Sequence, residues 1–172
     1  MRSFVFDAMP SRVLFAENAI EHLPREIEQL GARRALVLST PQQEALATDI
    51  SRRLGQRSVG VYPHAVMHVP IEVARKARDE AVRLGADCAV AVGGGSTVGL
   101  GKAIALESGL PILAIPTTYA GSEMTSIYGL TEAGIRRWRD RSRLIQARCE
   151  GCASRSGRRA ASHWAPFPAA SS

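Results

Sequence analysis

Residues 87–102 constrain the fold of this chain more than any other stretch, because they join a short apolar run, a glycine triplet and a helical pattern. The run 87–92 is too short for a helix and is typical of a strand buried on both faces. The glycines at 93–95 let the chain turn sharply and bring backbone N–H groups close to a ligand. Ser96 or Thr97 can cap the helix that follows, whose N-terminus favours an anion. The stretch predicts a strand–turn–helix unit that binds a phosphate, with a tight turn that holds no ligand as the alternative.

Short apolar runs alternate with helical patterns along the chain before residue 116. Strands are expected at 4–7, 11–17, 34–39, 58–62, 87–92 and 111–115. Helices with a period near 3.6 residues are expected to end at Gly31, Gly55 and Gly85. The alternation predicts an α/β fold, namely a Rossmann-like parallel sheet with helices on both faces.

In such a sheet, ligands bind beyond the carboxyl ends of the strands. Three loops are expected at that edge: Ser39-Thr40-Pro41, the glycine turn from Gly93 to Thr97, and Pro116-Thr117-Thr118. Hydroxyl groups in strand-end loops can donate to phosphate or ribose oxygens, although capping of a turn is an equal alternative.

Composition narrows the class of protein. The chain is 45% hydrophobic and 22% charged, which is typical of a globular domain. No apolar run reaches the roughly 18 residues of a membrane span, and the N-terminus lacks a signal-peptide core. Three cysteines are too few for a disulfide framework, so we expect a cytoplasmic protein without a membrane partner.

The net charge of +6 is unevenly distributed. Residues 135–172 hold nine arginines against Asp140 and Glu150, a balance of +7, which leaves −1 for residues 1–134. The body of the chain therefore gives no electrostatic case for nucleic acid. The arginine-rich segment 135–172 is expected to be unrelated to the preceding domain and poorly ordered, as the product of a shifted reading frame after residue 134. A genuine basic tail that binds RNA or an acidic surface is the alternative.

Several motifs together resemble the iron-containing alcohol dehydrogenase family. They are Gly93-Gly94-Gly95-Ser96 with Lys102, then Pro116-Thr117-Thr118, then Gly121-Ser122-Glu123-Met124-Thr125. Within the family, residues 119–132 resemble the maleylacetate reductase branch, which has this Thr-Tyr-Ala-Gly-Ser-Glu form. The resemblance covers residues 1–134.

The resemblance implies an NAD(P)-binding domain like the N-terminal domain of dehydroquinate synthase. It implies that Gly93, Gly94, Gly95 and Ser96 hold the pyrophosphate, that Thr117 and Thr118 lie toward the nicotinamide, and that Ser39 and Thr40 lie near the adenosine ribose. Lys102 joins this set, although Gly99 stands where many relatives carry an Asp. Because no carboxylate occupies positions 39 and 40, both NADH and NADPH stay open as cofactors.

The resemblance also implies an activity, the reduction of maleylacetate, a small-molecule substrate, to 3-oxoadipate in the breakdown of aromatic compounds. Full-length relatives form homodimers and carry a second, all-helical domain with the metal site, which nothing in this sequence matches. His64 and His68, and likewise Cys149 and Cys152, are not interpreted as metal ligands. We therefore predict no catalytic or metal-binding residue and little activity for this truncated chain. The alternatives are another oxidoreductase of the same family, such as an alcohol, lactaldehyde or glycerol dehydrogenase, and a nucleotide-binding module without catalysis.

Overall fold

A parallel sheet forms the centre of the protein in a computed structural model, which describes residues 12–125, 127–132, 135–140 and 144–149. Within these ranges six strands pair in the order β1-β8-β5-β4-β2-β3, and every pairing is parallel. Their bounds are Arg12–Ala16 (β1), Ala35–Leu38 (β2), Ser58–Tyr62 (β3), Cys88–Gly93 (β4), Ile112–Pro116 (β5) and Leu144–Cys149 (β8).

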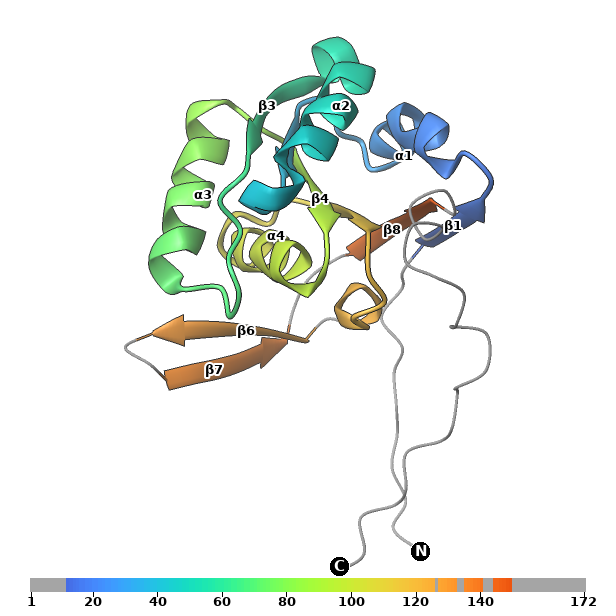
Figure 1. Ribbon diagram of the computed structural model, residues 1–172. Coiled ribbons are helices and arrows are strands. Elements are labelled where there is room, and N and C mark those ends of the chain that lie inside the picture. The colour runs from blue at the N-terminus through green and yellow to red at the C-terminus, as the bar shows by residue number, and fades with distance from the viewer. Residues whose placement is uncertain (1–11, 126, 133–134, 141–143, 150–172) are drawn as a thin grey trace, which may run out of the picture.

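Helices cover both faces of this sheet, as the sequence predicts (Figure 1). The α-helices of the described residues are Leu23–Gln29 (α1), Glu44–Leu54 (α2), Ile71–Arg83 (α3) and Gly95–Ser108 (α4). Short 3-10 turns occupy Ala19–His22, Pro41–Gln43, Gly55–Arg57 and Ser122–Met124. The first predicted helix is thus divided into a 3-10 turn and α1, because Pro24 fits only the first turn of a helix.

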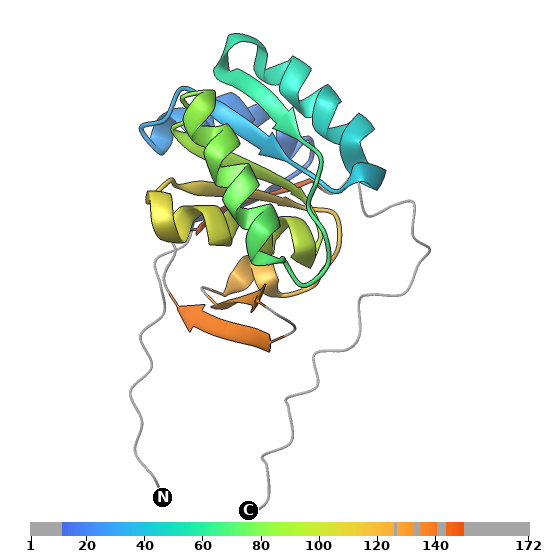
Figure 2. The ribbon, with the colours of Figure 1, turned by 90° about the vertical axis from the view of Figure 1, so that its left-hand side faces the viewer.

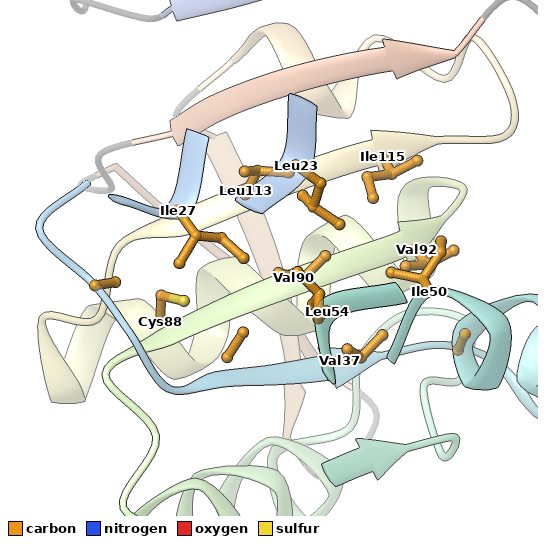
Figure 3. Packing of buried hydrophobic residues seen from close by; sticks show 13 residues of the cluster. Leu23, Ile27, Val37, Ile50, Leu54, Cys88, Val90, Val92, Leu113 and Ile115 are labelled. Carbon is orange, nitrogen blue, oxygen red and sulfur yellow. The ribbon is translucent and has the colours of Figure 1, made fainter. Parts of the chain in front are cut away.

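Two apolar layers hold the helices on the sheet. On one face Leu23 and Ile27 of α1 and Ile50 of α2 pack with alternate residues of the central strands (Figure 3). On the other face three alanines of α3 (Ala74, Ala77 and Ala81) pack with Leu36 and Leu38 of β2 and with Leu100 and Ile104 of α4. Strand β4 contributes to both layers, since all six of its residues are buried. This burial confirms the reading of the apolar run as a central strand.

A topological switch lies beside β2. The chain passes from β2 through α2 to the edge strand β3, and then returns through α3 to β4 on the other side of β2. In doubly wound sheets the loops on either side of such a switch diverge and leave a crevice at the carboxyl edge. The ends of β2, β4 and β5 meet at this edge.

A two-stranded hairpin, β6 (Ile127–Glu132) with β7 (Ile135–Asp140), lies between β5 and β8 in the chain. It lies beside the start of α3, where Thr131 donates through its N–H to Val69 O (3.2 Å) and through its Oγ1 to His68 O (2.8 Å) (Figures 1 and 2). The hairpin therefore fixes the loop that enters α3.

Two stretches after residue 134 form strands, while the expectation of poor order for residues 135–172 stays a prediction. Residues 135–140 pair with β6, and residues 144–149 form β8 between β1 and β5. Strand pairing satisfies backbone groups and does not need the helical periodicity that ends near residue 134. The predicted strand 4–7 and residues 141–143 and 150–172 lie outside the described residues. The domain boundary at 134 and its origin in a shifted reading frame stay predictions.

Candidate functional site

Three loops predicted to gather at the carboxyl edge of the sheet are brought together by strand register. Gly93 of β4 is paired with Pro116 of β5, and Leu38 of β2 is paired with Ala91 of β4. The N–H of Thr117 donates to Gly93 O at 3.1 Å, which extends the pairing into the loops. The edge therefore carries the glycine turn between the hydroxyl-bearing ends of β2 and β5.

The glycine turn delivers the N-terminus of α4 to this edge. Gly93 has φ +149°, a backbone conformation that residues other than glycine rarely adopt. Gly94 precedes the helix in extended conformation. The N–H groups of Thr97 and Val98 both donate to Gly94 O at 3.1 Å. The amides of Gly95 and Ser96 precede these first helical donors, at positions where a helix offers N–H groups to a ligand. Both residues are only half-buried, so a phosphate can reach them.

Close packing around the turn explains why glycines stand here. A Cβ atom at Gly94 would lie 2.7 Å from Thr118 Oγ1, and one at Gly95 would lie 3.4 Å from Ala120 Cβ. The loop after β5 thus approaches the backbone of the turn so closely that a methyl group at Gly94 would displace the Thr118 hydroxyl. This cradle of bare backbone beside a hydroxyl suits a phosphate or ribose group.

Gln43 belongs to the same edge and was not predicted from the sequence. It ends the 3-10 turn after β2, where its Nε2 donates to Thr117 Oγ1 at 2.7 Å. Its Oε1 would lie 2.5 Å from a Cβ atom at Gly93. The only sequence signal is its place just after the Ser39-Thr40-Pro41 loop, because its partner is 74 residues further along the chain.

Two buried hydroxyl groups lie at the ends of β2 and at the start of α4. Ser39 and Thr97 are fully buried, and neither Ser39 Oγ nor Thr97 Oγ1 has a hydrogen-bond partner among the described residues. Burial of an unpaired hydroxyl is unfavourable, so each such group calls for an explanation, such as a bound water or ion. Thr40 is half-buried next to Ser39, and its carbonyl accepts from the N–H of Gln43 at 3.0 Å.

Lys102 has a different environment from the other predicted residues. It is fully buried, and its Nζ donates to the carbonyl oxygen of Ser122 and to Ser122 Oγ, the latter at 3.3 Å. The ammonium therefore attaches the Ser122–Met124 turn to α4. Glu123, which follows Ser122 in the chain, is also buried. A direct contact of Lys102 with a cofactor stays a prediction.

Gly99, at the position where the resemblance leads one to expect an Asp, has its space filled by an apolar side chain. A Cβ atom at Gly99 would lie 3.1 Å from Val69 Cγ2. Val69 and the preceding His68 have φ values of +38° and +64°. Such values are strained for residues other than glycine, and strain of this kind clusters near functional sites.

His64 also lies near this edge, since it follows β3 and the N–H of the next residue, Ala65, donates to Ser39 O at 2.9 Å. The ring of His64 packs edge-on against Tyr62 at a centroid distance of 5.0 Å. Burial raises the pKa of the Cys88 thiol to about 12, so this thiol is uncharged at neutral pH. Within the part of the chain that the structure describes, no three His, Cys, Asp or Glu side chains form a group that could hold a metal ion. No helix in the described ranges is long and apolar enough to cross a membrane.

Comparison with known proteins gives consistent matches. The sequence model of a family described as iron-containing alcohol dehydrogenase matches residues 10–143. A maleylacetate reductase of Burkholderia cepacia is 66% identical over 136 residues, which cover 79% of this chain and 39% of that protein. A maleylacetate reductase of Sphingobium indicum is 50% identical over 133 residues, which cover 77% and 38% respectively. This chain therefore spans about two fifths of the length of the curated relatives it matches.

Solved structures share the fold. The crystal structure of maleylacetate reductase from Agrobacterium tumefaciens superimposes with a TM-score of 0.82 at 44% identity, covering 87% of this chain and 43% of that one. Sulfoacetaldehyde reductase from Bifidobacterium kashiwanohense, solved in complex with NAD+, gives a TM-score of 0.76 at 18% identity and covers 87% and 47%. At that identity the second match shows the fold alone.

Proposed function

The chain belongs to the iron-containing alcohol dehydrogenase family, and we propose that its carboxyl edge binds NADH or NADPH for the reduction of maleylacetate to 3-oxoadipate. The glycine turn, the start of α4 and the Thr117–Thr118 loop would hold the cofactor between them. The relatives at 66% and 50% identity are maleylacetate reductases, which supports this substrate over others of the family.

The observation that carries the proposal is the contact between the glycine turn and the loop after β5. Since a Cβ atom at Gly94 would meet Thr118 Oγ1 at 2.7 Å, bare amides and a hydroxyl group occupy one small space. The amides of Gly95 and Ser96 would bind the pyrophosphate at the positive end of the α4 dipole. Thr117 and Thr118 would then contact the nicotinamide half, and Ser39 and Thr40 the adenosine ribose.

The residues at the end of β2 bear on the choice between the two cofactors. A carboxylate at this place hydrogen-bonds the ribose hydroxyls of NADH and repels the 2′-phosphate of NADPH. This chain has Ser39 and Thr40 instead, and neither side chain carries a negative charge that would repel the 2′-phosphate. We therefore propose that the chain binds both NADH and NADPH.

The reaction needs a hydride and a proton, which add across the carbon–carbon double bond of maleylacetate. The bound nicotinamide would supply the hydride, while the protein supplies binding and orientation. We assign no proton donor among the described residues. Because the relatives extend well beyond the segment matched here, we expect low reductase activity from the 172-residue chain.

Titration of the purified 172-residue chain with NADH and with NADPH, followed by nicotinamide fluorescence, tests the cofactor proposal. Saturable binding of both is expected, and Ser96→Asp should weaken both because it places a negative charge beside the phosphate. The same change at Ser108, at the opposite end of α4, is the control and should leave binding unchanged. Absence of saturable binding would refute the proposal. NADH oxidation on addition of maleylacetate, measured on the same preparation, separates a working reductase from a binding module without catalysis.

A further inference from the structure

We infer that Gln43 is a positioning residue, whose side-chain amide orients the Thr117 hydroxyl so that its hydrogen is available to the cofactor. The inference rests on the proposed cofactor site, and it adds a residue that the family motifs do not contain. Three strand ends meet at this side chain: it follows β2, it lies against Gly93 at the end of β4, and it bonds to Thr117 after β5.

The hydrogen bond fixes the direction of the threonine hydroxyl. Gln43 Nε2 donates to Thr117 Oγ1 at 2.7 Å, and Nε2 can only donate. A hydroxyl has one hydrogen and two lone pairs, so the bond from Gln43 occupies a lone pair and leaves the hydrogen free to donate. Thr117 can therefore offer a donor to a phosphate, ribose or carboxamide oxygen.

The carbonyl end of the Gln43 amide lies beside Gly93. A Cβ atom at Gly93 would lie 2.5 Å from both Gln43 Oε1 and Thr97 Oγ1, so these two oxygens flank the same point of the backbone. Thr97 carries a hydroxyl hydrogen, and within the described ranges this hydroxyl has no hydrogen-bond partner. Nε2, at the other end of the amide, faces Thr117, the acceptor of its hydrogen bond.

Gln43 lies at the surface of the fold and is not part of the hydrophobic core. It is half-buried at the end of a 3-10 turn, and Thr117 is likewise half-buried. Replacement of its amide should therefore disturb the orientation of Thr117 more than the stability of the fold. Gln42, its exposed neighbour in the same turn, offers a matched control position.

The test is a double-mutant cycle on the full 172-residue chain, with NADH affinity as the readout. Gln43→Leu removes the donor and should weaken NADH binding about 5-fold, the effect of one hydrogen bond. Gln43→Glu replaces the donor by an acceptor that takes the Thr117 hydrogen for itself, so a loss of about 10-fold or more is expected. Gln42→Leu and Gln42→Glu should each leave the affinity within about 2-fold, since surface changes are close to neutral.

The cycle distinguishes orientation from general support of the fold. In a Thr117→Val background the hydroxyl is gone, so Gln43→Leu should cost less than about 2-fold in further affinity. Melting temperatures without cofactor should be similar for Gln43→Leu and Gln42→Leu. Equal losses in both backgrounds, or unchanged affinity in Gln43→Leu, would overturn the inference. If the unchanged chain itself fails to bind NADH, the proposed function fails, and this result is distinct from a failure of the Gln43 inference alone.

Discussion

Gly93 offers the most direct test of how the glycine turn is packed. A Cβ atom there would lie 2.5 Å from Gln43 Oε1 and 2.5 Å from Thr97 Oγ1, and the backbone has φ +149°. Gly93→Ala therefore combines a strained backbone, which costs about 1–3 kcal/mol, with overpacking, which costs about 1–3 kcal/mol. The lower entropy of the unfolded alanine chain offsets about 0.4–1 kcal/mol. We expect a net loss of about 1–5 kcal/mol in the free energy of unfolding.

Urea denaturation followed by circular dichroism measures this loss, and thermal melting should show a decrease of roughly 2–4 °C for each kcal/mol lost in a chain of this size. Gly109→Ala is the matched control, since Gly109 has φ +71° and open space around its Cα, so it carries the backbone cost alone. Truncation of Gln43 to alanine in the Gly93→Ala background should recover part of the loss, because one of the two close oxygens is removed. If Gly93→Ala destabilises no more than Gly109→Ala, the close packing of Gln43 and Thr97 around the turn is refuted.

Three further changes test other parts of the structure. Gly94→Ala keeps an allowed backbone but displaces the Thr118 hydroxyl, so NADH affinity should fall about 5-fold while the melting temperature changes little; a large drop in melting temperature would contradict this. Arg12→Leu should lower the melting temperature by a few degrees at neutral pH, because the hydrogen bond from Arg12 Nε holds down the pKa of the buried Glu26 carboxyl. A carboxyl whose pKa is lower in the folded state stabilises the fold at pH values above its pKa in the unfolded chain. The difference in melting temperature between Arg12→Leu and wild type should therefore shrink as the pH falls below about 4. A difference that stays constant would argue against the ion pair. Cys88, in a Cys149→Ser/Cys152→Ser background, should react with iodoacetamide at least about 100-fold slower than in the urea-unfolded chain, and equal rates would contradict its burial.

The sequence by itself determined the class of fold and most of the elements of the site. Its apolar runs and helix-ending glycines predicted the strands β2 to β5 and the helices α2 and α3 to within about two residues, because periodicity and glycine conformations are local properties of the chain. The glycine triplet predicted a strand–turn–helix unit, and the parallel topology predicted that the loops at Ser39, Gly93 and Thr117 share one edge. Local chemistry was sufficient for these inferences.

Tertiary structure alone decided how those loops touch. Gln43 and Thr117 are joined by a hydrogen bond across 74 residues, and Lys102 is turned toward Ser122 because α4 packs beside that turn. Strand β8 enters the sheet between β1 and β5, although the apolar pattern weakens before it. These features depend on distances between segments that are remote in the sequence, and no local pattern records such distances. The sequence therefore predicts which residues reach the site, while strand register and packing decide which of them contact one another.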